Sequence, residues 1–294
     1  MPASEPPISW PQPLIEIAGF IAAFLSAGAV GFRYAALGRA NATSDDERRV
    51  LGGAARGAAA LGLLGALIAA VLLATRLPGF AARRHLTVIE LMAKDPPTAA
   101  QVGFMVVALL GFALALGRRI VGWPLAAIGV LGGSLRALLF AQWVRAVNPI
   151  HELAGGLWIG TLFVLVVVGL TVVLRSPLPS ERRGALAAEM VHGFSPLALG
   201  SATVLATFGV MTAWRHLHGL SNLWLTPYGI TLIVKLCVVA AVVAFGAWNW
   251  RRQRPRLGDE AGTLALRGTA RAELALAAVV LAVTSILVSL PSPR

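Results

Sequence analysis

The sequence predicts an all-α membrane protein, a bundle of about eight transmembrane helices with both termini on the outer side. Of its 294 residues, 57% are hydrophobic and only 13% are charged, against roughly 25% charged in a soluble domain. The apolar residues form eight long runs, and most of the arginines lie between these runs. The formal net charge of +12 therefore indicates membrane topology rather than nucleic-acid binding.

A helix needs about 20 mostly apolar residues to cross a hydrocarbon layer ~30 Å thick. Helices are expected because unpaired backbone groups cannot face lipid. The eight spans are predicted at residues 14–37, 57–75, 101–117, 123–144, 150–174, 196–214, 229–250 and 272–290. Residues 251–262 are predicted to be an inner loop, and residues 81–93 a short amphipathic helix in the outer connection between spans two and three.

The basic residues predict the orientation. Of the 25 Lys and Arg residues, 16 lie in or beside the connections after spans one, three, five and seven, and 7 lie in the termini and the other connections. The positive-inside rule then places both termini outside. We divide the chain into an N-terminal four-helix membrane region, residues 1–148, and a second four-helix membrane domain, residues 149–294.

Histidine and methionine residues concentrate toward the outer side in this topology. The chain has five His and, besides Met1, four Met. Seven of these nine are expected at or near the outer side: His85, Met92, Met105, His151, Met211, His216 and His218. Imidazole and thioether ligands suit copper ions, so the bias favours copper handling. The alternative is that these side chains fill space or lie at the interface.

Two local arrangements sharpen the copper prediction. His151 and Trp158 are seven residues apart, with Gly155 between them, so on an α-helix they share a face with room for an ion or another helix. Met211 and His218 share a face if span six continues outward. The predicted metal ligands, all near the outer ends of spans five and six, are His151, His216, His218 and Met211. The alternative for Trp158 is the aromatic belt or helix packing.

Two cations, Arg136 and Lys235, lie inside predicted spans at similar depth, nearer the outer end. Charges within a membrane are costly and normally face the bundle interior with partners. Glu16 and Glu152, near the outer ends of spans one and five, are the available acids. These residues predict a polar outer vestibule. The alternative is structural ion pairing with the long side chains reaching toward the interface.

Common enzyme signatures are missing from the sequence. It has no Walker or Rossmann loop, no HExxH, no GxSxG and no CxxC, so no enzymatic activity is expected. Two other functions remain open beside copper transport. One is a membrane haem or quinone electron carrier, in which His151 with His216 or His218 would ligate a haem. The other is a non-transporting accessory membrane subunit, in which the outward bias of His and Met is chance.

A series of short motifs runs through the second half of the chain. It begins with IHELAGGLWIGTLFVL, continues with FSPLALGSATVLATFGV and LTPYGITLIVKL, and ends with NWRRQRPRL, RAEL and SLPSPR. In this order and spacing, over about residues 149–291, the motifs resemble the CopD family of bacterial inner-membrane copper proteins. The first four spans resemble its eight-helix members in number more than in residues. Two positions depart from the family pattern: Gln142 replaces a His near the end of span four, and Phe208 precedes Gly209 where the family has Thr-Gly.

The resemblance implies copper transport or tolerance, with copper as the transported ion moving inward from the periplasm. It also implies a bacterial inner-membrane location and a small periplasmic CopC-like copper-binding partner. In that membrane, the orientation predicted from the basic residues places both termini in the periplasm. The family motifs point to His151, Trp158, Tyr228 and Lys235. Together with the charged residues above, the predicted transport vestibule consists of Glu152, Trp158, Arg136, Lys235 and Tyr228.

Overall fold

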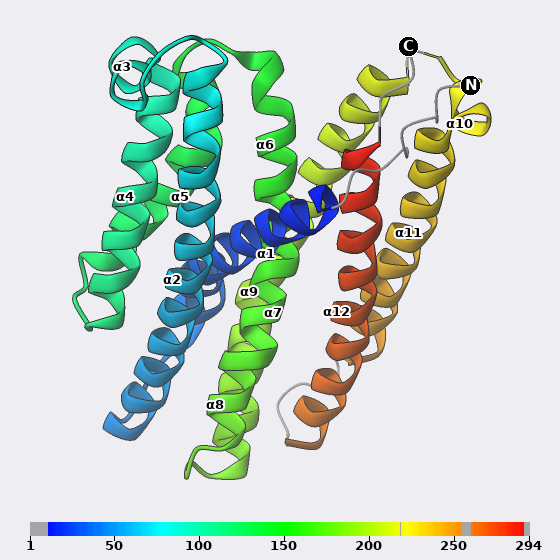
Figure 1. The fold of residues 1–294 in the computed structure, drawn as a ribbon. Helices are drawn as coiled ribbons and strands as arrows, with labels where there is room; N and C mark the ends of the chain where they lie inside the picture. Colours follow the sequence, from blue (N-terminus) through cyan, green and yellow to red (C-terminus); the bar gives the residue numbers. More distant parts are fainter. Residues whose placement is uncertain (1–10, 218, 254–259, 291–294) are drawn as a thin grey trace.

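The computed structural model describes residues 11–217, 219–253 and 260–290, without the side chains of residues 216, 249–250 and 252–267 (Figure 1). These residues form helices and no strand. Eight helices are long and apolar enough to cross a membrane, which confirms the predicted fold class. The first span is α1 (Gln12–Gly31), which continues as η1 (Phe32–Ala36) and η2 (Leu37–Arg39).

The remaining spans follow in order along the chain. They are α2 (Asp45–Ala82), α4 (Pro96–Leu116), α5 (Gly122–Leu139), a fifth span of five consecutive segments, α9 (Ser180–Leu217), α11 (Pro227–Gln253) and α12 (Glu260–Ser289). The fifth span consists of α6 (Trp143–Gly155), η3 (Gly156–Gly160), α7 (Thr161–Val164), η4 (Leu165–Gly169) and α8 (Leu170–Leu174).

Two short helices, α3 (Val88–Lys94) and α10 (Asn222–Leu225), lie at the same end of the bundle (Figure 1). We call this the outer end, after the predicted orientation. The opposite, inner end carries the connections at residues 40–44, 117–121 and 175–179. Which end faces the cytoplasm stays a prediction.

Two spans are much longer than the apolar runs that predicted them. Both α2 and α9 have 38 residues, about 57 Å of helix, whereas residues 57–75 and 196–214 were predicted. Hydropathy detects only the part of a helix that lies in lipid. The polar start of α2 is stabilised by Ser44, whose side chain accepts a hydrogen bond from the backbone N–H of Glu47.

The outer connection after α2 differs from the single helix predicted at residues 81–93. There α2 continues to Ala82, the chain turns at His85 with φ of 55°, and α3 begins after Thr87. The Thr87 side chain caps the backbone of Glu90, and the Glu90 carboxylate accepts from the backbone of Thr87. This capping box separates the two helices, so the prediction was wrong in its bounds.

α1 crosses the bundle obliquely and packs very closely against the fifth span (Figure 1). A Cβ added to Gly160 of η3 would lie 2.2 Å from the carbonyl oxygen of Phe24 in α1, and one added to Gly28 would lie 2.3 Å from the backbone of Gly160. The hydroxyl of Thr161 donates to the carbonyl of Gly28 at 3.5 Å. The two backbones therefore touch through small residues, as is common for membrane helices.

The main core cluster is rich in alanine and joins α1, α2, α4, α5, the fifth span and α9. A smaller cluster of Leu217, Tyr228, Leu232 and Leu287 holds the outer ends of α9, α11 and α12 together. The predicted boundary at residues 148 and 149 falls inside α6, and α1 packs against helices of both halves. The division into two regions stays a prediction.

Candidate functional site

The fifth span changes its helical winding between His151 and Trp158. His151 lies in α6, and Trp158 lies in η3, a π-helical segment. A π-helix has i→i+5 hydrogen bonds and more residues per turn than an α-helix, so the seven-residue spacing no longer sets both side chains on one face. Trp158 is partly buried against the main core cluster. The space beside Gly155 is filled by Phe24, whose ring lies 3.1 Å from a Cβ added there.

His151 faces the seam between α6 and α9. On the outer side of His151, two polar contacts join the helices. The Thr212 hydroxyl donates to the Asn148 side chain at 3.0 Å, and the Arg215 guanidinium donates to the Val144 carbonyl at 2.9 Å. The imidazole itself packs on Gly209 of α9, where an added Cβ would lie 3.2 Å from its Cε1 atom. The ring fits because position 209 has no side chain.

The imidazole of His151 has an unused nitrogen. The ring interacts with the backbone of Leu205 in α9, but its Nδ1 atom is buried and has no partner at hydrogen-bond geometry among the described residues. Buried polar atoms are nearly always paired, and an imidazole nitrogen is also a good ligand for copper. The Nδ1 atom of His151 is therefore the candidate metal-ligand atom in the described part of the seam.

α9 presents a stripe of positions to α6. Gly209 contacts His151 and Thr212 contacts Asn148, and position 216 follows Gly209 by seven residues, at the same angular register. The side chain of His216 and all of His218 lie outside the described residues. Met211 lies off this stripe and is 45% exposed, so the structure does not bring it to His151.

Lys235 and Tyr228 approach the same region from α11. Tyr228, Leu232 and Lys235 follow an i, i+4, i+7 pattern and so share a face of α11. Tyr228 and Leu232 are buried in the smaller cluster, and Lys235 is close enough to His151 for the two side chains to interact electrostatically. Of the residues to which the family motifs point, Lys235 thus approaches His151, whereas Tyr228 lies in the smaller cluster and Trp158 against the main one.

Glu152, next to His151, faces a different set of charges. It interacts electrostatically with Glu16, Arg136 and Arg76. Glu16 of α1 is itself 3.5 Å from Arg76 of α2, and Arg136 of α5 donates to the Gly133 carbonyl at 2.6 Å. Two acids and two arginines from four spans form this outer charge cluster, which therefore carries little net charge.

A cavity of about 470 Å³ opens beside the outer charge cluster and includes Arg136 and Gln142 in its wall. Its other charged residues are Arg83, Arg84, Arg145 and Asp95. Arg84 pairs with Asp95 at 2.8 Å, and this hydrogen bond holds the pKa of the Asp95 carboxyl below its ordinary value. Arginine exceeds acid in this wall, so it disfavours entry of a free cation.

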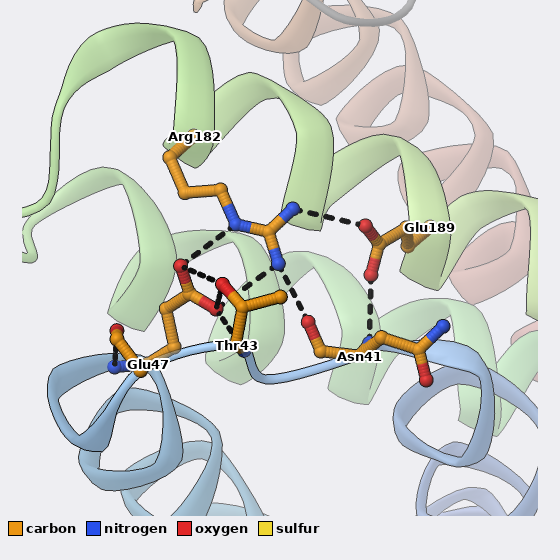
Figure 2. Close-up of polar contacts among 6 residues, drawn as sticks. Asn41, Thr43, Glu47, Arg182 and Glu189 are labelled. Carbon is orange, nitrogen blue, oxygen red and sulfur yellow. Dashed lines mark hydrogen bonds and ion pairs between the residues drawn. The ribbon is translucent and has the colours of Figure 1, made fainter.

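A second polar network lies at the inner end and was not predicted (Figure 2). Arg182 of α9 makes two hydrogen bonds to the Glu47 carboxylate, at 2.8 and 3.0 Å, and one to Glu189 at 3.1 Å. Its guanidinium also donates to the Asn41 carbonyl at 2.5 Å, while Glu47 accepts from the backbone N–H of Thr43 at 2.6 Å. We call these five residues the inner clasp. They join the α1–α2 connection to α9.

The described residues hold no group of three or more His, Cys, Asp or Glu arranged to bind a metal ion. Any copper ion at His151 would therefore have few protein ligands in the described part of the chain. Such a site suits a passing ion better than a permanently bound one, because a transported ion must also leave.

The comparisons with known proteins point to copper. Residues 188–287 match the family model described as Copper resistance protein D. The chain is also 30% identical over 147 residues to the copper transport protein CutJ of Bacillus subtilis (strain 168). That alignment covers 49% of this chain and 25% of the relative, so the chain spans about a quarter of the relative's length. No solved structure matches the chain.

The family match covers only part of the candidate site. Tyr228 and Lys235 lie within the matched segment, whereas His151 and Trp158 precede it. The resemblance predicted from the sequence motifs is confirmed, and the matched segment comprises most of α9, α11 and most of α12.

Proposed function

We propose that the protein moves copper ions across the bacterial inner membrane, inward from the periplasm. The premise is that residues 188–287 match the family model of Copper resistance protein D. The chain is a copper-related, multi-pass membrane protein. Copper is its substrate in this proposal, and no enzymatic step is required. The observation that carries the proposal is the buried, unpaired Nδ1 of His151 in the seam between α6 and α9.

The proposed path starts at the outer end of α9. Position 216 occupies the register that leads along α9 toward Gly209 and His151. His218 lies outside the described residues and is proposed as a second outer ligand from its place in the sequence alone. Imidazole binds both Cu(I) and Cu(II), so a copper ion can pass from the outer histidines to His151 without a change of ligand type. Met211, which lies off this stripe and is exposed, is left out of the proposed path.

The positive charge of Lys235 would favour release of the copper ion from His151. A fixed positive charge near His151 opposes a bound cation by Coulomb repulsion, which is stronger within the protein than in water. Copper would therefore bind transiently, and the outer charge cluster around Glu152 would keep the neighbouring vestibule polar without adding net charge. A small periplasmic copper-binding protein of the CopC kind is the proposed donor.

The test compares His151→Ala with a matched control, His85→Ala. His85 is also predicted on the outer side but is exposed in the connection before α3. We expect His151→Ala to lower the copper stoichiometry of purified protein and to slow copper uptake into proteoliposomes, while His85→Ala leaves both unchanged. Equal copper content and uptake in wild type and His151→Ala would refute the proposed site.

The same preparation separates the other functions left open by the sequence. A Soret absorption band in washed, purified protein would support a haem carrier in place of copper transport. Proteoliposomes that take up no copper beyond empty vesicles would support the accessory-subunit alternative.

A further inference from the structure

The inner end contains a large basic cavity that the copper path does not use. It has a volume of about 1030 Å³ and lies between η1, the start of α2 and the connection from α4 to α5. Six arginines line it: Arg33, Arg48, Arg49, Arg56, Arg118 and Arg119. Asp45 is the one acid in the wall, so the cavity is strongly positive.

Most of this positive charge is not neutralised within the protein. Arg48 pairs with Asp45 at 2.5 Å, and Arg49 pairs with Asp46 at 3.2 Å. Within residues 11–217, 219–253 and 260–290, the guanidinium groups of the other four arginines of the wall have no hydrogen-bond or ion-pair partner.

The inner clasp provides a contrast at the same end of the molecule. There Arg182 is paired with two carboxylates. The inner end therefore contains one arginine paired with carboxylates and a cavity in which four guanidinium groups have no anionic partner among the described residues.

Two backbone segments on opposite sides of the cavity carry most of its arginines. Arg49, Gly52 and Arg56 follow an i, i+3, i+7 pattern, so they share the face of α2 that lines the cavity. A Cβ added to Gly52 would meet nothing within 4 Å. Across the cavity, Arg118 adopts a left-handed backbone conformation with φ of 63°, a conformation that usually favours glycine.

The rest of the wall is apolar. Leu37, Leu51, Ile120 and Trp123 also line the cavity. Trp123 is 7% exposed, and its ring stands edge-on to Phe112 with the centroids 6.2 Å apart, so this part of the wall is firmly packed. Ile120 is 88% exposed. A small soluble anion would make no favourable contact with these apolar side chains. A lipid has both a charged headgroup and apolar chains, so it can contact both parts of the wall.

We propose that this cavity binds the phosphate headgroup of an anionic phospholipid from the inner leaflet. Arginine guanidinium groups form paired hydrogen bonds with phosphate oxygens. The four unpaired arginines would hold the headgroup, and the acyl chains would lie along the apolar wall near Ile120. Anionic lipids concentrate basic protein segments at the inner membrane surface, so the ligand is abundant where the cavity opens.

The test measures lipid enrichment around the full-length protein in nanodiscs that contain phosphatidylglycerol and phosphatidylcholine. The variant Arg33→Gln/Arg119→Gln removes two cavity arginines. The control Arg175→Gln/Arg251→Gln removes two exposed arginines elsewhere at the inner end, so both proteins lose the same charge. We expect native mass spectrometry to show bound phosphatidylglycerol in wild type and control, and about tenfold weaker retention in the cavity variant.

Each other outcome overturns the proposal. Equal retention in the two double variants would show that the arginines act only through total charge. Equal retention of phosphatidylcholine would show that the headgroup charge is not recognised. Displacement of phosphatidylglycerol by millimolar inorganic phosphate, with phosphate retained in its place, would assign the cavity to a soluble anion instead.

Discussion

Gly209 tests whether the position of the His151 ring matters for copper. A Cβ added at position 209 would lie 3.2 Å from Cε1 and 3.6 Å from Nδ1 of His151. The first distance is tighter than an ordinary contact, so Gly209→Ala requires the ring to move by a few tenths of an ångström. Metal–ligand distances tolerate only about 0.2 Å. The substitution therefore moves the ligand by more than a copper site accepts.

We expect Gly209→Ala to change the free energy of unfolding very little. Replacing glycine by alanine within a helix gains about 1 kcal/mol, and the tight contact costs about 1 kcal/mol or slightly more, so the two nearly cancel. We expect copper affinity to fall about tenfold, as when groups that orient a ligand are changed, with the apparent Tm nearly unchanged. Gly209→Val, which is bulkier, should abolish binding.

Isothermal titration of purified protein with copper measures the affinity, and differential scanning fluorimetry measures the apparent Tm. Gly200→Ala is the matched control, because it lies in the same helix and its added Cβ would meet nothing within 4 Å. If Gly209→Ala and Gly209→Val are folded and bind copper as tightly as Gly200→Ala, the ring of His151 does not hold the ion.

Two further predictions concern the architecture. Gly160→Ala places a Cβ 2.2 Å from the backbone oxygen of Phe24, so it should lower the free energy of unfolding by about 1–3 kcal/mol and lower the apparent Tm. Gly19→Ala in α1, with open space around it, should leave the apparent Tm unchanged. Equal Tm values for the two variants would contradict the close crossing of α1 and the fifth span. In the inner clasp, Glu47→Gln and Arg182→Gln should each lower the apparent Tm. The Tm of the double variant should be little lower than that of either single variant, because both substitutions remove the same contacts. Fully additive decreases in Tm would show that the two residues act independently.

Composition was sufficient to predict the eight spans, because burial in lipid imposes one simple requirement on every one of them. The helix ends were harder. The Ser44–Glu47 spacing is a recognisable capping signal that marks the start of α2 some residues before the apolar run. The π-helical segment at Gly156–Gly160 has no comparable signal, since it coincides with a close approach of α1 that depends on the packed structure.

The candidate site was only partly predictable for a related reason. His151 and Lys235 were identified as polar residues in apolar spans, and the structure brings them near each other. The sequence does not show which face of α9 meets α6, because apolar residues occur all around that helix. Nothing in the sequence therefore places Met211 on or off the stripe that contacts α6, and its role as a metal ligand stays a prediction. Arg182 and Glu47 are 135 positions apart, and no local pattern indicates that they pair.

The inner clasp limits how this bundle can move. Arg182 ties the start of α9 to Glu47 and to the Asn41 carbonyl. The inner ends of the first, second and sixth spans are therefore joined by side-chain hydrogen bonds. In the proposed transport, a rearrangement that keeps these contacts would separate the spans at the outer end rather than at the inner end. Entry and exit of cargo would then differ mechanically, with a fixed pivot on one surface of the membrane and a variable opening on the other.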